Sequence, residues 1–254
     1  MMKLNELSFL FDDYVKIADK VSIQIPKVEQ VARESNYSMY LRVMTLTTRE
    51  LFSSLREVDE YEDKYPNVWQ MVFDKEGDMI FGQMLGNKSG LDIIIDTLSY
   101  WTGLKSSSFK ALSNKKMINE DASWVIDEQV FEEVRQIIIK MTGYEPNEDL
   151  VAPRNMSERQ FGVWEKLYKG RIRKLSKGGG STFADKIIIL QISMDSYIPL
   201  DEIRKMTIYH FNKLYDGLQS KEAYLSQREI LLSPKFDSKQ NSNPKHWRES
   251  FNKK

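Results

Sequence analysis

The chain has 254 residues, of which 41% are hydrophobic, 11% aromatic and 29% charged, and it contains no cysteine. This composition is typical of a soluble globular protein with a substantial apolar core, and it excludes a wholly disordered chain. The lack of cysteine excludes disulfides, a thiol nucleophile and cysteine-ligated zinc or iron–sulfur sites.

The formal net charge of zero conceals an asymmetry along the chain. Residues 1–150 carry 17 basic and 26 acidic side chains, a net charge of −9, whereas residues 151–254 carry 20 basic and 11 acidic ones, a net charge of +9. Opposite charges favour association. We therefore expect the two halves to dock on each other, or copies of the chain to stack head to tail. Binding of the basic half to nucleic acid is the alternative.

The first residues give no targeting or membrane signal. The apolar run near the start is broken by Asp12 and Asp13, which is not typical of a signal peptide. Nowhere does an apolar run approach the ~20 residues that a membrane-spanning helix needs. We expect neither export by a visible signal nor membrane insertion.

In chain order, the first elements are a short strand and several helices. Residues 21–25 alternate apolar and polar side chains up to Pro26, which predicts a strand, and a helix is expected over residues 27–34. Thr47 or Thr48 can cap the next helix. Its apolar members recur at spacings of three and four: Leu51, Phe52 and Leu55. The acidic run at residues 57–63 is predicted to be a solvated linker.

The rest of the first half predicts more helices and one hairpin. Residues 68–85 indicate helical or mixed structure with a turn at Gly77, and a helix over residues 91–101 should end at Gly103. Residues 115–127 are typical of a hairpin or a single strand. A continuous apolar face predicts a helix over residues 128–141, which Gly143 and Pro146 end. Its members are Val130, Phe131, Val134, Ile137, Ile138 and Met141.

The second half predicts a helical bundle. Ser157 opens a basic amphipathic helix, whose apolar side is Phe161, Trp164, Tyr168, Ile172 and Leu175. Residues 183–194 are apolar on nearly all sides and are predicted to be a buried helix. Pro199 starts a further helix, and a long apolar face follows at Ile208, Phe211, Tyr215 and Leu218. The polar stretch 233–243 is expected to be a loop, after which Trp247 and Phe251 dock a last short helix.

These patterns predict a mainly α fold divided into two lobes. An acidic, mostly helical N-terminal lobe with a few short strands spans residues 1–146, and a basic helical C-terminal lobe spans residues 157–254. The polar segment 147–156, which contains Pro153, is predicted to be the linker between them.

Three glycines, Gly178 to Gly180, precede Ser181 and Thr182 and raise the question of a phosphate site. A phosphate-binding P-loop needs a lysine directly after its last glycine and a strand before it. Here no lysine lies between Gly180 and Ser181, and a helix precedes the glycines instead of a strand. The glycine pattern of dinucleotide-binding folds fails in the same context. The stretch is predicted to be a hinge in which Gly178 ends one helix and Thr182 or Ser181 caps the next.

No other constellation indicates an enzyme or a cofactor. Asp92 and Asp96 share a helix face, but two carboxylates supply too few ligands for a divalent cation. The two histidines, His210 and His246, lack a metal-ligand spacing or a Ser–His–Asp order. We therefore expect no catalytic residues, no metal and no cofactor.

A DNA-binding regulator is the alternative function. Residues 187–218 have a helix–turn–helix rhythm beside a basic helix. The expected recognition segment, residues 207–217, offers only Lys213 as a cation, opposed by Asp216, and is rich in aromatic residues. Such a segment is more typical of a core or a protein contact.

A set of short patterns in the second half resembles a known family. They are Ser157-Glu-Arg-Gln with Trp164-Glu165, Thr182-Phe-Ala-Asp185-Lys-Ile, Ile203-Arg-Lys-Met206-Thr-Ile-Tyr209 with Phe211 and Tyr215, and Lys245-His-Trp247. Over residues 155–250 this order resembles tail and baseplate proteins of bacteriophages of Gram-positive hosts, including tail-assembly-chaperone-like proteins. The resemblance implies a non-enzymatic assembly factor or structural subunit. It implies phage tail or baseplate proteins as partners, and the host cytoplasm during assembly, or the virion, as the location.

The expected partner surface lies in the second half. Tyr209, Phe211, Tyr215 and Tyr224 do not share a single face of the helix whose core residues are Phe211, Leu214 and Leu218, and tyrosine is enriched at protein interfaces. We expect Tyr209 and Tyr224, with Arg171 and Lys174 on the basic helix, to contact a phage component or a second copy. The alternative is that the tyrosines are buried in the bundle.

Overall fold

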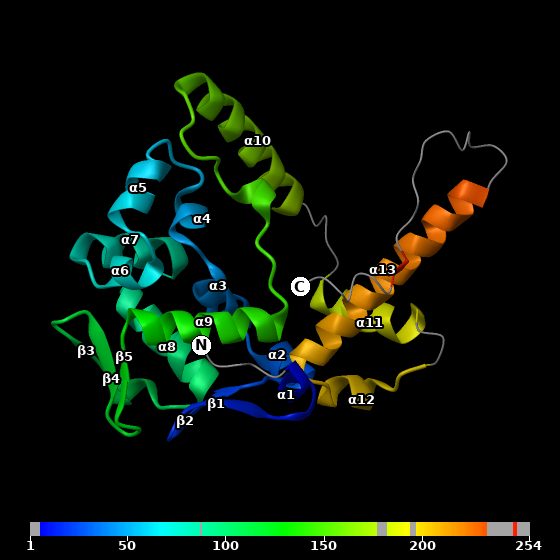
Figure 1. Cartoon of the computed structure of the whole chain (residues 1–254), viewed down its shortest axis with the longest axis horizontal. Helices are drawn as coiled ribbons and strands as arrows, with labels where there is room; N and C mark the ends of the chain where they lie inside the picture. The colour runs from blue at the N-terminus through cyan, green and yellow to red at the C-terminus, as the bar shows by residue number, and fades with distance from the viewer. Residues whose placement is uncertain (1–5, 87, 177–181, 194–196, 233–245, 248–254) are drawn as a thin grey trace.

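The computed structural model describes residues 6–86, 88–176, 182–193, 197–232 and 246–247. Within these residues the chain forms thirteen α-helices, two 3-10 helices and two small antiparallel sheets (Figure 1). The predicted fold class is confirmed: the structure is mainly α, and the strands lie in the N-terminal half. No helix in the described ranges has both the length and the apolar character needed to cross a membrane.

The helices of the N-terminal half are mostly short. They are α1 (Glu6–Phe11), α2 (Val28–Arg33), α3 (Tyr37–Thr45), α4 (Thr48–Phe52), α5 (Val58–Lys64), α6 (Val68–Val72), α7 (Lys75–Leu85), α8 (Gly90–Thr102) and α9 (Glu128–Thr142). One hairpin pairs β1 (Tyr14–Ala18) with β2 (Val21–Gln24). A three-stranded meander follows α8 and consists of β3 (Phe109–Leu112), β4 (Lys116–Asn119) and β5 (Trp124–Ile126).

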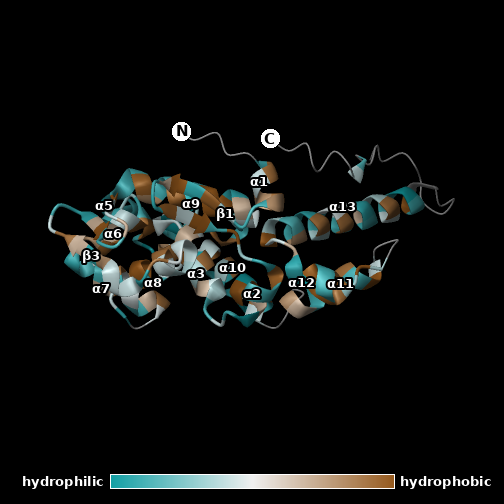
Figure 2. Cartoon of the chain, turned by 90° about the horizontal axis from the view of Figure 1, so that it is seen from below, coloured by the Kyte–Doolittle hydropathy of each residue, from teal (hydrophilic) through white to brown (hydrophobic). Residues whose placement is uncertain are grey.

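The C-terminal half is helical, as predicted. After the 3-10 turn η2 (Glu148–Leu150), it consists of α10 (Glu158–Ser176), α11 (Phe183–Ser193), α12 (Leu200–Lys205) and α13 (Ile208–Leu232). In Figure 1, α10 stands above α9, while α11, α12 and α13 lie to one side of the N-terminal elements. Figure 2 shows hydrophobic and hydrophilic positions alternating along α11 and α13.

The described apolar residues form two buried clusters. The main cluster gathers most buried side chains of α1 to α9 and both sheets, together with Ala152, Trp164 and Tyr209, and its largest fully buried members are Trp69 and Trp101. The second cluster is smaller and lies between α2, α11, α12 and α13. Its buried members are Val28, Val31, Leu190, Ile203, Ile208, Phe211 and Leu218.

The second cluster joins the two ends of the chain, because α2 comes from the N-terminal half. Two backbone hydrogen bonds flank the contact, from Val28 N to Met206 O at 2.9 Å and from Ile208 N to Pro26 O at 2.8 Å. The Thr207 hydroxyl also donates to the carbonyl oxygen of Phe9 at 2.7 Å. The halves are therefore in direct contact within one chain. The division at residues 147–156 stays a prediction.

Several local sequence signals act as expected. The Thr47 side chain accepts a hydrogen bond from the Glu50 backbone N–H, and the Glu50 carboxylate accepts one from Thr47 N at 2.7 Å, so the start of α4 is capped reciprocally. Gly103 ends α8 with a φ of 69°, a left-handed conformation that glycine adopts without a Cβ clash. The hairpin expected near residues 115–127 is present as β4 and β5, and β3 extends it.

Two predictions about the N-terminal half were wrong. The acidic run 57–63 is not a solvated linker but forms most of α5, because two of its carboxylates pair with the buried Arg49. Gly77 lies inside the first turn of α7 instead of in a turn between elements. A Cβ at Gly77 would come within 2.3 Å of the Met71 carbonyl oxygen, so glycine allows α6 and α7 to approach closely.

The prediction that residues 183–194 are buried was also wrong. In α11 only Leu190 is fully buried, whereas Ile188 and Ile192 are 53% and 73% exposed. The second cluster is small and covers one side of the helix, so the opposite apolar side faces outward. Gly178 to Gly180 of the predicted hinge, the polar stretch 233–243 and Phe251 lie outside the described residues, whereas Thr182 caps α11 as predicted, because its hydroxyl accepts a hydrogen bond from Asp185 N at 3.1 Å.

Candidate protein-interaction surfaces

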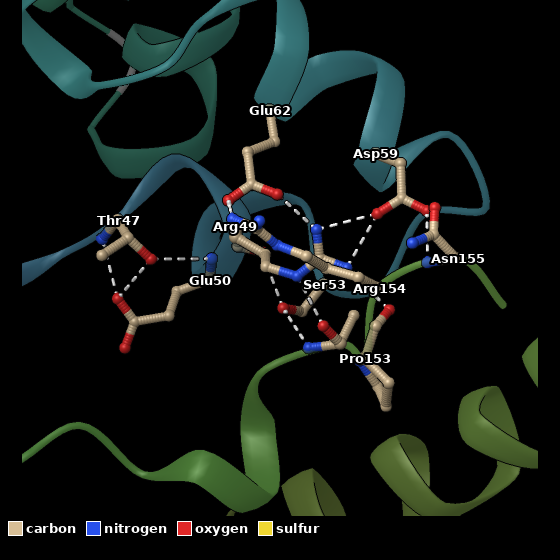
Figure 3. A network of polar contacts seen from close by, with 10 residues as sticks. Thr47, Arg49, Glu50, Ser53, Asp59, Glu62, Pro153, Arg154 and Asn155 are labelled. Atoms are coloured by element: carbon tan, nitrogen blue, oxygen red, sulfur yellow. Dashed lines mark hydrogen bonds and ion pairs between the residues drawn. The ribbon is translucent and has the colours of Figure 1, made fainter.

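A network of hydrogen bonds and ion pairs surrounds Arg49 at the start of α4 (Figure 3). The side chain of Arg49 is only 8% exposed and contacts the carboxylates of Asp59 and Glu62 on α5. It also donates to the carbonyl oxygens of Ala152 and Pro153, each at 2.6 Å. Hydrogen bonding to Arg49 holds the pKa of Asp59 below its ordinary value. Every charge at this centre is matched by a partner.

The same region fixes the root of α10. The Ser53 hydroxyl accepts a hydrogen bond from Ala152 N at 3.0 Å, and the Ser53 carbonyl accepts one from the Trp164 indole N–H at 2.8 Å. Arg154 pairs with Glu62 at 2.8 Å, which adds a second cation to the network. These contacts attach the segment after α9 to α4 and α5, so we interpret the Arg49 network as a structural junction.

The four residues expected at a partner interface do not come together on one surface. Arg171 and Lys174 lie on α10, whereas Tyr209 and Tyr224 lie on α13. Arg171 donates to the Asp149 carbonyl at 2.6 Å and lies over the Trp164 ring, while Lys174 is exposed. Tyr224 is half-buried, and its ring centroid is 4.9 Å from that of His246. Interface roles for Arg171, Lys174 and Tyr224 stay predictions.

Tyr209 has the buried position that was the alternative. Its side chain is 6% exposed, its ring lies 5.3 Å from that of Phe9, and its hydroxyl donates to the Glu6 carboxylate at 2.9 Å. Burial, with a further contribution from the hydrogen bond to Glu6, raises the pKa of Tyr209 to about 12. Tyr209 therefore attaches α13 to α1 inside the chain and does not offer its ring to a partner.

A surface that sequence reasoning missed lies on α11. Ala184, Ile188 and Ile192 follow one another at intervals of four residues, so they form one stripe along the helix, which we call the α11 stripe. All three side chains are exposed. Among the apolar residues that follow in the described chain, Tyr197 and Leu200 are exposed by 73% and 47%, whereas Ile198 packs against the second cluster. The signal was available, because a short helix that is apolar all round needs neighbours on every side.

The residues considered for metal or DNA chemistry have other surroundings. Asp96 pairs with Lys88 at 3.0 Å, and the described residues contain no group of three potential ligands that could hold a metal ion. Phe211 and Tyr215, from the expected DNA-recognition segment, are buried. Lys213 is exposed and its ammonium lies 5.5 Å from the centroid of the Tyr209 ring. The DNA-binding alternative stays a prediction. In the described residues 207–217, Tyr209, Phe211 and Tyr215 are buried, and Lys213 is the one lysine or arginine.

The fold and these surfaces define a helical protein with well-paired internal charges and an uncovered apolar helix face. Comparison with protein families matches residues 174–252 to the model of the YomV second domain, a phage-derived family. The matched segment begins at the end of α10 and contains α11, α12 and α13. No curated protein and no solved structure gives a significant match. Residues 174–252 are therefore similar to a phage-derived domain family.

Proposed function

We propose that the protein is a non-enzymatic assembly or structural protein of a phage tail or baseplate, and that it acts through protein–protein contacts. The observation that carries this proposal is the α11 stripe, which is apolar, exposed and part of the segment similar to a phage-derived domain. In this proposal the protein works in the host cytoplasm during assembly or remains in the particle.

The physical argument rests on the position of the stripe. Apolar side chains gain roughly 25 cal/mol for each Å² that is removed from water. Ile188 and Ile192 gain little of this within the chain, because they are 53% and 73% exposed. A partner that covers them would gain it on binding, and contiguous exposed apolar residues on a folded protein are typical of interaction sites.

The polar groups fit the same proposal. The charges around Arg49 connect α4, α5 and the chain at residues 152–155. They leave no unpaired nucleophile or acid at that centre. A protein of this kind recognises other proteins by shape and apolar area, and it needs no reaction.

The proposal can be tested in the bacterium that carries the gene. Deleting the gene should yield phage particles with missing or incomplete tails in electron micrographs, and the parent chain should restore them. Ile188→Asp with Ile192→Asp should fail to restore tails, because it places two carboxylates on the stripe. Met79→Asp on α7 is the matched control, since Met79 is also an exposed apolar helix residue, and it should restore tails.

Two results would overturn the proposal. One is normal tails in the deletion strain. The other is full restoration of tails by the double aspartate variant at parental protein level. Normal particles together with altered transcription and binding of the purified chain to a defined DNA fragment would favour the regulator instead.

A further inference from the structure

A groove of about 960 Å³ lies between β1, β5 and α9. Its apolar lining includes Ile17 from β1, Val125 from β5 and two residues of α9, Val130 and Ile137. Val125 is 45% exposed, although it lies on the middle residue of a strand. The groove has the size and apolar character of sites that receive a helix or a ligand from outside.

The wall of the groove is acidic. Asp127, Glu128, Glu132 and Glu133 line it, and Lys140 is the cation among its lining residues, so these five groups have a net charge of −3. Glu132 pairs with Arg135 at 2.7 Å and Asp127 with Lys116 at 3.8 Å, so Glu128 and Glu133 are the lining carboxylates without an ion pair to a described residue. Glu133 is exposed and makes no hydrogen bond or ion pair with any residue that the structure describes. A ligand for this groove should combine apolar area with positive charge.

Helix α10 carries such a face on the side away from the body. Trp164 and Tyr168 point to the main cluster, whereas Val163 and Leu167, one turn apart, are 56% and 51% exposed. Besides Arg171, which pairs with Asp149 at 3.0 Å, four cations lie within about one residue step of this pair on a 3.6-residue helix: Arg159, Lys166, Arg173 and Lys174. All four are exposed, and none forms an ion pair within the described part of the chain.

We propose that the outward face of α10 in one copy of the chain occupies the α9 groove of a second copy. Val163 and Leu167 cover the apolar lining, and the cations of α10 lie along Glu133 and its acidic neighbours. The occupant is assigned by charge complementarity, since the groove is acidic and the exposed helix is basic. In Figure 1, α10 lies above α9 whereas β1 lies below it, so helix and groove belong to different parts of one molecule.

This contact is head to tail. Each copy uses its helix for one neighbour and its groove for another, so repeated contacts give a ring or a filament and not only a closed dimer. The proposal goes beyond the proposed function, because it does not involve the α11 stripe or a phage partner. In this arrangement the acidic first half of one copy, which contains the groove, contacts the basic second half of the next copy, which contains α10.

The test uses sedimentation velocity of the full chain over a concentration series at 0.05 M and 0.5 M salt. The parent should associate at low salt, and its association constant should fall at least tenfold at high salt, where charges are screened over about 3–5 Å instead of more than 10 Å. A helix variant, Lys166→Glu with Leu167→Asp, and a groove variant, Val125→Lys with Glu133→Lys, should each be monomeric.

A mixture of the two variants tests directly whether the helix of one copy binds the groove of another. The helix variant keeps an intact groove and the groove variant keeps an intact helix, so the mixture should form one-to-one heterodimers and nothing larger. Met79→Asp and Met84→Asp should associate like the parent, and all melting temperatures should agree within about 2 °C because the changed residues are exposed.

A parent that stays monomeric at 0.05 M salt and millimolar concentration would overturn the proposal. So would variants that associate like the parent, or a mixture that stays monomeric. A monomeric parent whose groove variant loses binding to a purified phage tail protein would assign the groove to that protein instead of a second copy. A defect of the α11 stripe in particle assembly would remain under any of these results.

Discussion

The two apolar clusters use similar side chains in different ways. In the main cluster, helices and strands surround the apolar residues on all sides, and buried polar groups such as Arg49 fix the connections. In the second cluster, α11 offers apolar residues on both sides and only one side is covered. A run of isoleucines therefore does not decide burial by itself. The number of neighbouring elements decides it.

The largest expected effect tests whether the two clusters unfold together. Phe211 is fully buried in the second cluster, so Phe211→Ala should lower the free energy of unfolding by about 3–5 kcal/mol. Urea denaturation followed by circular dichroism measures this loss. Tryptophan fluorescence reports the main cluster, which contains Trp69, Trp101, Trp124 and Trp164.

Because α2 and Thr207 connect the clusters, both signals should shift together to lower urea. If the fluorescence midpoint stays at the parental value while the circular dichroism shows an early phase, the clusters are independent units. That result would turn the comparison into one between two separately folding parts.

The next effect tests the junction of the main cluster. Arg49→Met should cost about 2–3 kcal/mol, because two carbonyl oxygens and two carboxylates lose a buried donor. Denaturation in urea at pH 7 measures it. Arg204→Met is a matched control, since Arg204 also pairs with a carboxylate across the halves but is 44% exposed, and it should cost far less.

The ion pair between Arg49 and Asp59 should also make the free energy of unfolding depend on pH. The pKa of Asp59 is lower in the folded chain, so its contribution is present above the ordinary value near 3.8 and is lost as the pH falls below it. Asp59→Asn should therefore flatten the stability profile between about pH 4 and pH 2. Glu62, Arg154 and the Asn155 backbone N–H also contact this network, and their contribution should persist. A profile as steep as that of the parent would contradict the role of Asp59.

A smaller effect is expected where the C-terminal half attaches to α1. Tyr209→Phe removes the hydrogen bond to Glu6 but keeps the ring against Phe9, so it should cost about 1 kcal/mol. With its pKa raised to about 12, the tyrosine stabilises the fold fully below pH 10, and this stabilisation is lost as the pH rises towards 12. Thermal denaturation between pH 7 and pH 10 should show a constant difference between parent and variant. A destabilisation above 3 kcal/mol would mean that the ring itself had moved.

The smallest effect is expected on the uncovered side of α11. Ile192→Asp should change the free energy of unfolding by no more than about 0.5 kcal/mol, since the side chain is 73% exposed. Chemical denaturation of the purified chain measures it. A loss of several kcal/mol would show that Ile192 is buried in solution, and the contrast between the two clusters would disappear.

The elements with strong local signals could be predicted from the sequence. The apolar face of α9, the cap at Thr47 and the end of α8 at Gly103 depend on residues within one or two turns. The errors arose where distant residues decide the structure. The carboxylates of α5 are ordered by Arg49, whose other partners, Ala152 and Pro153, are more than a hundred residues away.

For the candidate surfaces too, features set by nearby residues could be predicted and features set by distant residues could not. The basic character of α10 is visible in the sequence, but which of its faces is free depends on the position of Trp164 against Ser53. Tyr209 was expected at a partner interface, with burial as the alternative, and the partners that bury it, Phe9 and Glu6, lie about 200 residues earlier. No periodicity within the C-terminal half could have identified them.

The hydrogen bond between Thr207 and Phe9 spans 198 residues, and this separation has a consequence for synthesis on the ribosome. At roughly 5–20 residues per second, Phe9 is made about 10–40 s before Thr207. During this time α2 exists without α12 and α13, so Val28 and Val31 have no cluster to enter. The nascent chain must keep Val28 and Val31 from wrong partners until its last helices emerge, and slow translation of the C-terminal half should lengthen the exposure of these residues to chaperones.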